Sequence, residues 1–85
     1  MEPWPEWWRY EVILSPHALD RMEERGLAET DLRAMLEDAA DYRESAAPGR
    51  FIIATTFGVQ NWEIVVEPDE REAVLVVVTA YRVES

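Results

Sequence analysis

The chain of 85 residues contains no cysteine, no lysine, a single histidine and three glycines. Without cysteine it can form no disulfide and offers no thiolate to a metal. A membrane-spanning helix needs about 20 consecutive apolar residues, and no segment approaches that length. The N-terminal residues lack a basic stretch followed by an apolar one, so no secretory signal peptide is predicted. We therefore expect a cytoplasmic protein that needs no metal, no cofactor and no membrane.

The chain is strongly acidic, because 18 Asp and Glu residues oppose eight arginines and give a net charge of −10. A negative field of this size repels nucleic acid at long range and favours cationic partners. RNA is therefore a disfavoured partner, and a basic protein is a favoured one. The length suits one domain, and an apolar content of 48% is enough to fill its core.

The hydrophobic pattern predicts one α+β domain over residues 9–83, preceded by an extended segment rich in Trp and Pro at residues 1–8. Ser15 suits a helix N-cap, Pro16 the first helical position and Gly26 the residue after the end, which predicts a first helix. An apolar face at helical spacing predicts a second helix over residues 27–42. Strand-like runs occupy residues 9–14, 50–57, 62–67 and 73–82.

The resulting order, β-α-α-β-β-β, predicts a helix pair packed on one face of a small, mostly antiparallel four-stranded sheet. The run "VLVVV" in the last segment is apolar at every position, which is typical of a central strand covered on both sides. The second sheet face should stay partly open, and five polar side chains compete to line it: Glu63, Glu67, Thr79, Tyr81 and Arg82.

The first helix carries a basic stripe, because His17, Arg21 and Arg25 follow one another at i, i+4 and i+8. Arg21 can pair with Glu24, but Arg25 has no acid three or four residues before it, so its partner must come from elsewhere. One interpretation is structural: both arginines lie over the core edge and pair with groups of the chain itself. The other is an anion pocket in which His17 acts as acid or base. A metal site is not expected, because His17 lacks enough ligands near it.

The same stretch resembles a signature of small bacterial domains of unknown function, His-Ala-x-x-Arg-Met-x-x-Arg-Gly followed by an aliphatic residue and an acid. The resemblance covers residues 12–82, and the matching positions are His17, Ala18, Arg21, Met22, Arg25, Gly26, Leu27 and Asp31. The element order is also similar to the RelE/ParE-type toxin fold and the BrnT-type toxins near it. That resemblance implies a toxin that cuts mRNA or poisons another target and is inhibited by a cognate antitoxin.

If the chain is an enzyme, it is expected to be a metal-independent ribonuclease that uses His17, Arg21, Arg25 and Arg82. Such a reaction needs a group to take the 2′-OH proton, a group to protonate the leaving oxygen and cations to stabilise the phosphorane. Arg50 and Tyr81 would contribute to binding, although exposed arginines at strand ends are more often simply solvated.

The tryptophans suggest a protein partner, because adjacent Trp7 and Trp8 cannot both point inward from an extended segment. One of them should then be exposed or bind a partner, such as a cognate antitoxin or a second copy of the chain. The alternative is that the segment folds back over the core. Three functions therefore remain open: a RelE/ParE-like toxin, a non-catalytic protein-interaction module, and an acidic antitoxin-like or immunity-like inhibitor of a basic partner.

Overall fold

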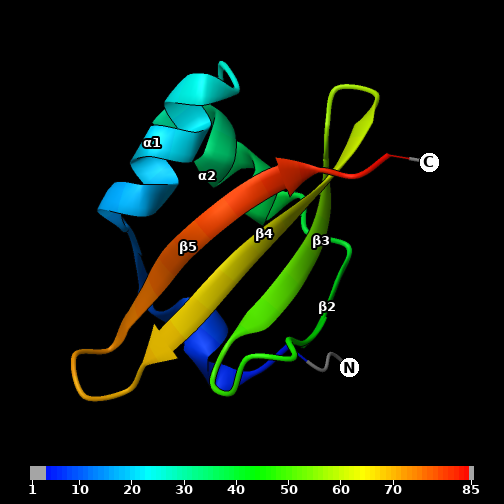
Figure 1. Ribbon diagram of the computed structural model, residues 1–85. Coiled ribbons are helices and arrows are strands. Elements are labelled where there is room, and N and C mark those ends of the chain that lie inside the picture. Colours follow the sequence, from blue (N-terminus) through cyan, green and yellow to red (C-terminus); the bar gives the residue numbers. More distant parts are fainter. Residues whose placement is uncertain (1–3, 85) are drawn as a thin grey trace.

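The computed structural model describes residues 4–84, which form a mixed sheet with two α-helices and a short 3₁₀ helix (Figure 1). In chain order the elements are η1 (Glu6–Arg9), β1 (Glu11–Leu14), α1 (Pro16–Glu24), α2 (Glu29–Glu37), β2 (Asp41–Glu44), β3 (Phe51–Phe57), β4 (Gln60–Asp69) and β5 (Val74–Arg82). The fold class is α+β, as the sequence predicts.

The described sheet has five strands in the order β1-β5-β4-β3-β2. β1 pairs with β5 in parallel, and the other neighbours are antiparallel. The last strand therefore lies between β1 and β4, inside the sheet and not at its edge. The register of β4 and β5 shifts between Val65 and Val66.

The expectation of four strands was wrong, because residues 41–44 form the edge strand β2, where a helix ending at residue 42 and a loop after it were expected. The helix predicted over residues 27–42 is α2, which ends at Glu37. β2 was missed because "DYRE" is short and charged, as edge strands that avoid further pairing often are. Its backbone pairing with β3 starts next to Ala40, whose N–H donates to the carbonyl of Ala54 at 2.8 Å.

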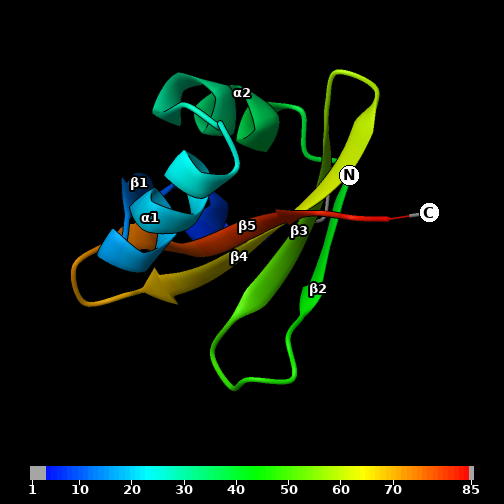
Figure 2. The same cartoon turned by 45° about the horizontal axis from the view of Figure 1, so that its top comes forward.

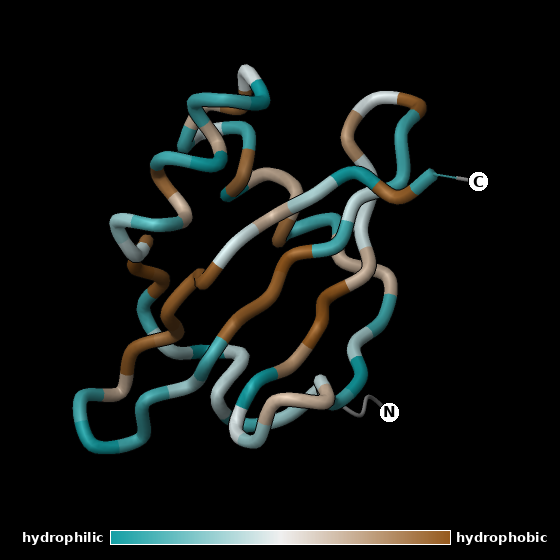
Figure 3. Tube along the Cα trace, viewed as in Figure 1, coloured by the Kyte–Doolittle hydropathy of each residue, from teal (hydrophilic) through white to brown (hydrophobic). Residues whose placement is uncertain are grey.

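Both α-helices pack on the same face of the sheet (Figure 2). α1 contacts β5 and α2 contacts β3, where the Thr55 hydroxyl donates a hydrogen bond to the Met35 carbonyl. The core lies between these layers, and the hydropathy trace shows apolar residues along the middle strands (Figure 3). Its fully buried large side chains are Leu32, Met35, Ile53, Ile64, Leu75, Val66 and Val77.

The N-terminal segment was expected to be extended, but Glu6–Arg9 form one turn of 3₁₀ helix, and residues 1–3 lie outside the described part. In such a turn, successive side chains point about 120° apart, so Trp7 can enter the core while Trp8 covers its rim. Trp7 is only 8% exposed, and its ring lies 4.7 Å from that of Phe51 on β3. The segment thus folds back over the sheet.

Candidate functional site

The start of α1 is fixed by its sequence, because the Ser15 side chain accepts a hydrogen bond from the Ala18 N–H and Pro16 occupies the first helical turn. Ala18 and Met22 face the core. This orientation places the basic stripe of His17, Arg21 and Arg25 beside the buried face. Gly26, with a φ of 69°, ends the helix in the left-handed region that glycine adopts easily.

α1 also protects the part of the β5 edge that β1 leaves unpaired. β1 pairs with β5 only as far as Val77. The Ser15 N–H donates to the Val77 carbonyl at 3.1 Å, and Arg25 Nη1 donates to the Ala80 carbonyl at 3.1 Å. The group that faces Arg25 is therefore a backbone carbonyl of its own chain.

His17 and Arg21 do not converge with the other candidate residues. The His17 side chain is exposed on the first turn of α1, and Arg25 follows eight residues later. That spacing corresponds to about 12 Å along the helix axis. Arg21 Nη1 pairs with Glu24 Oε1 at 2.9 Å, as expected from their i, i+3 spacing. Such an exposed pair contributes little to stability.

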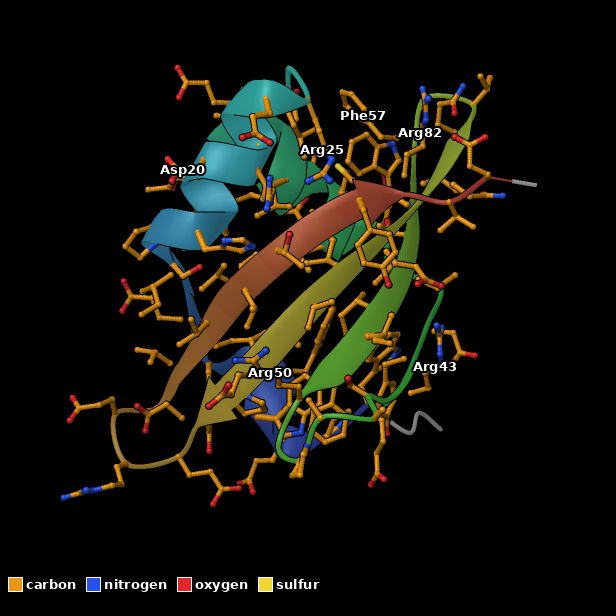
Figure 4. All side chains as sticks on the ribbon, in the orientation of Figure 1. Asp20, Arg25, Arg43, Arg50, Phe57 and Arg82 are labelled. Carbon is orange, nitrogen blue, oxygen red and sulfur yellow. The ribbon has the colours of Figure 1, made fainter. Side chains whose placement is uncertain are left out.

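A hollow of about 340 Å³ at the end of β5 brings together Arg25, Tyr81 and Arg82, three of the residues singled out in the sequence, with Trp62 and Glu84. Figure 4 shows Arg25 and Arg82 at the same end of the sheet, away from Arg43 and Arg50. Trp62 and Arg82 are direct partners in the β4–β5 register, so their side chains leave the same face of the sheet. Arg82 approaches Glu84 Oε2 at 3.7 Å.

Trp62 was not predicted as a site residue, because its place in an alternating strand indicates only a core side chain. It is 6% exposed, and within residues 4–84 its Nε1 is a buried polar side-chain atom without a hydrogen-bond partner. An unpaired buried donor costs about 1–3 kcal/mol. The sequence carries no signal for this feature, since it depends on which acceptors the fold brings near the indole.

The sheet face opposite the helices carries a polar network centred on Glu63. Tyr81 Oη donates to Glu63 Oε1 at 2.7 Å, and Arg43 Nη2 pairs with Glu63 Oε2 at 3.1 Å. The hydrogen bond from Tyr81 and the pairing with Arg43 hold the pKa of Glu63 below its ordinary value. Burial, and then the neighbouring Glu63 carboxylate, raise the pKa of Tyr81. Tyr81 therefore stays protonated and serves here as a hydrogen-bond donor.

The remaining predicted binding residues all contact their own chain. Arg50 Nε pairs with Glu67 Oε1 at 3.0 Å, and both side chains are largely exposed. Trp7 lies in the core, while half-buried Trp8 stacks on Trp4 with ring centroids 4.5 Å apart. The tryptophan segment thus forms an aromatic cluster over β2 and β3.

Residues 4–84 contain no group of three or more His, Asp or Glu side chains arranged to hold a metal ion. Within the same residues, no helix is long and apolar enough to cross a membrane.

Comparison with known proteins assigns a family but no activity. No curated protein and no solved structure matched this chain. A family model, described as a domain of unknown function (DUF4258), matches residues 14–82. This match includes the whole α1 motif and the strands β2 to β5. The chain therefore belongs to the DUF4258 family.

Proposed function

We propose that this protein is a non-catalytic binding domain that receives a basic protein partner on the open face of its sheet. The observation that carries the proposal is the separation of the residues expected to act in catalysis. Arg25 is bonded to the Ala80 carbonyl, Arg21 to Glu24, and His17 is exposed about 12 Å from Arg25 along α1. General acid–base catalysis needs its groups within hydrogen-bond reach of one substrate.

The open face has the composition of a protein-binding surface. Ile52, Val65 and Thr79 are consecutive cross-strand neighbours that are only partly buried, and Ile52 and Val65 do not pack against the core. The Glu63 network and the Arg50–Glu67 pair flank this row. An apolar strip framed by charged residues resembles the core and rim of protein interfaces.

The negative charge of the chain favours a positively charged partner. Both arginines of the open face are already paired with glutamates, and the chain as a whole carries −10. A second copy of the chain would bring the same charge and be repelled, whereas a basic protein would be attracted over a distance of about 10 Å at moderate salt. An antitoxin-like or immunity-like inhibitor is one form of this proposal, because its target would be a basic toxin.

Site-specific photocrosslinking in cells tests the proposal. A photoreactive side chain at Thr79 lies on the open face, and the matched control at exposed Thr30 lies on α2. We expect Thr79 to give a discrete adduct with a basic protein, and the purified complex to weaken as salt increases. An acidic partner, equal adducts from both positions or no adduct at Thr79 would contradict the proposal.

A toxin of the RelE/ParE sort is the second candidate. The observation in its favour is that Arg25 and Arg82 line one hollow, where two cations could hold a phosphate. This candidate requires His17 to act with that pair despite its distance, and it predicts growth arrest on expression.

A further inference from the structure

We propose that the hollow at the end of β5 binds a carboxylate group, supplied by a small organic acid or by the C-terminus of a peptide. The site lies at the end of β5, and Tyr81 both lines it and belongs to the glutamate network of the open face. The inference uses neither Glu63 nor a basic protein partner, so it does not depend on the proposed protein-binding function.

The guanidinium groups of Arg25 and Arg82 at the hollow have N–H donors that are not used within the described residues. Arg25 uses one N–H for the Ala80 carbonyl and keeps the others free within residues 4–84. The Arg82 guanidinium makes no hydrogen bond with the described residues, and its contact with Glu84 is long at 3.7 Å. The Arg82 and Glu84 side chains are 54% and 85% exposed, so water screens this pair and a ligand can displace it.

Trp62 supplies an independent indication of a ligand. Trp62 is one of the residues that line the hollow, and its indole N–H is buried and finds no acceptor among the described residues. Buried polar groups nearly always have a partner, and an indole N–H can only donate. A ligand that completes this site must therefore present an acceptor oxygen, which both guanidinium groups also require.

The surrounding charge favours a carboxylate over a phosphate. Glu84 borders the hollow, and the chain carries −10, so each additional negative charge on a ligand raises the cost of binding. A carboxylate carries one charge, and its planar pair of oxygens matches the fork of an arginine. A hollow of about 340 Å³ also has room for the small organic body attached to it.

Nuclear magnetic resonance of the ¹⁵N-labelled chain tests the inference through the indole N–H signals of its four tryptophans. Trp62→Phe identifies the Trp62 signal, and nuclear Overhauser contacts identify it if that variant does not fold. We expect benzoate to shift this signal saturably and the neutral benzamide to leave it in place. Inorganic phosphate should bind more weakly than benzoate.

Charge variants locate the binding at the hollow. Arg82→Gln should weaken benzoate about ten-fold, the usual loss for one charge-assisted hydrogen bond. Arg71→Gln makes the same charge change in the exposed β4–β5 turn and should leave the affinity unchanged. Glu84→Gln should strengthen binding, because it removes the competing negative charge.

A tripeptide with a free C-terminus and its C-terminal amide separate the two sources of the carboxylate. Tighter binding of the acid peptide than of benzoate indicates a peptide terminus, and the reverse indicates a small organic acid. The inference is wrong if no carboxylate shifts the Trp62 signal, as would happen if an ordered water satisfies the indole. It is also wrong if benzamide or phosphate binds as well as benzoate, or if Arg82→Gln and Arg71→Gln behave alike.

Discussion

Arg25→Gln removes the hydrogen bond through which the end of α1 holds the β5 edge. Hydrogen bonds from charged groups contribute about 1.5–3 kcal/mol, but Arg25 is an exposed residue and its bond to the Ala80 carbonyl is only partly buried, so its contribution should be smaller. We therefore expect a loss of about 1 kcal/mol in the free energy of unfolding. For a domain of this size, that loss lowers Tm by about 4–8 °C. Arg21→Gln breaks only the exposed pair with Glu24 and should cost less than about 0.5 kcal/mol.

Urea unfolding followed by far-ultraviolet circular dichroism measures both losses in the same assay. The dependence of the unfolding free energy on urea should stay the same in both variants, because neither changes the surface exposed on unfolding. Arg25→Lys keeps the positive charge but loses the planar guanidinium group, so its free energy of unfolding should lie between those of the wild type and Arg25→Gln. Equal losses for Arg21→Gln and Arg25→Gln would refute the structural role assigned to Arg25.

Four further substitutions test the open face and the N-terminal segment. Tyr81→Phe should raise the pKa of Glu63 towards its ordinary value of 4.5, measured by the carboxyl ¹³C shift. Because the pKa of Glu63 is lowered in the folded wild-type chain, the stability that this network contributes is present above pH 4.5 and is lost as the pH falls through the folded-state pKa. Tyr81→Phe should therefore reduce the loss of stability at acidic pH. Trp7→Ala should cost about 3 kcal/mol or more in urea unfolding, and Trp8→Ala clearly less, because only Trp7 is buried. Glu67→Gln should change stability by less than about 0.5 kcal/mol, because its pair is exposed.

Local signals in the sequence predicted much of the fold. Ser15 and Pro16 indicated the start of α1, and the apolar run "VLVVV" indicated that β5 lies inside the sheet. The charged strand β2 has no apolar alternation, so nothing local distinguishes it from a loop. The turn that buries Trp7 packs it against Phe51 of β3. Because Phe51 lies far from Trp7 in the sequence, the local residue pattern does not predict this contact.

The candidate site was predictable in its residues but not in their partners. The spacing of the α1 motif showed that Arg25 needs an acceptor, and the structure supplies one 55 residues away in the Ala80 carbonyl. Arg82 was singled out as a cation, but its proximity to Arg25 follows from β5 extending beyond β1. The unpaired indole N–H of Trp62 results from packing alone, so the residue pattern does not predict it.

Expression of the chain at a high level in bacterial cells tests most directly whether the α1 motif serves the fold and not catalysis. We expect unimpaired growth and intact mRNA, and the same result for His17→Ala, since exposed His17 lies about 12 Å from Arg25 along α1. The purified His17→Ala variant should keep the Tm of the wild-type chain. Growth arrest that His17→Ala relieves without a change in Tm would contradict the account and establish the toxin.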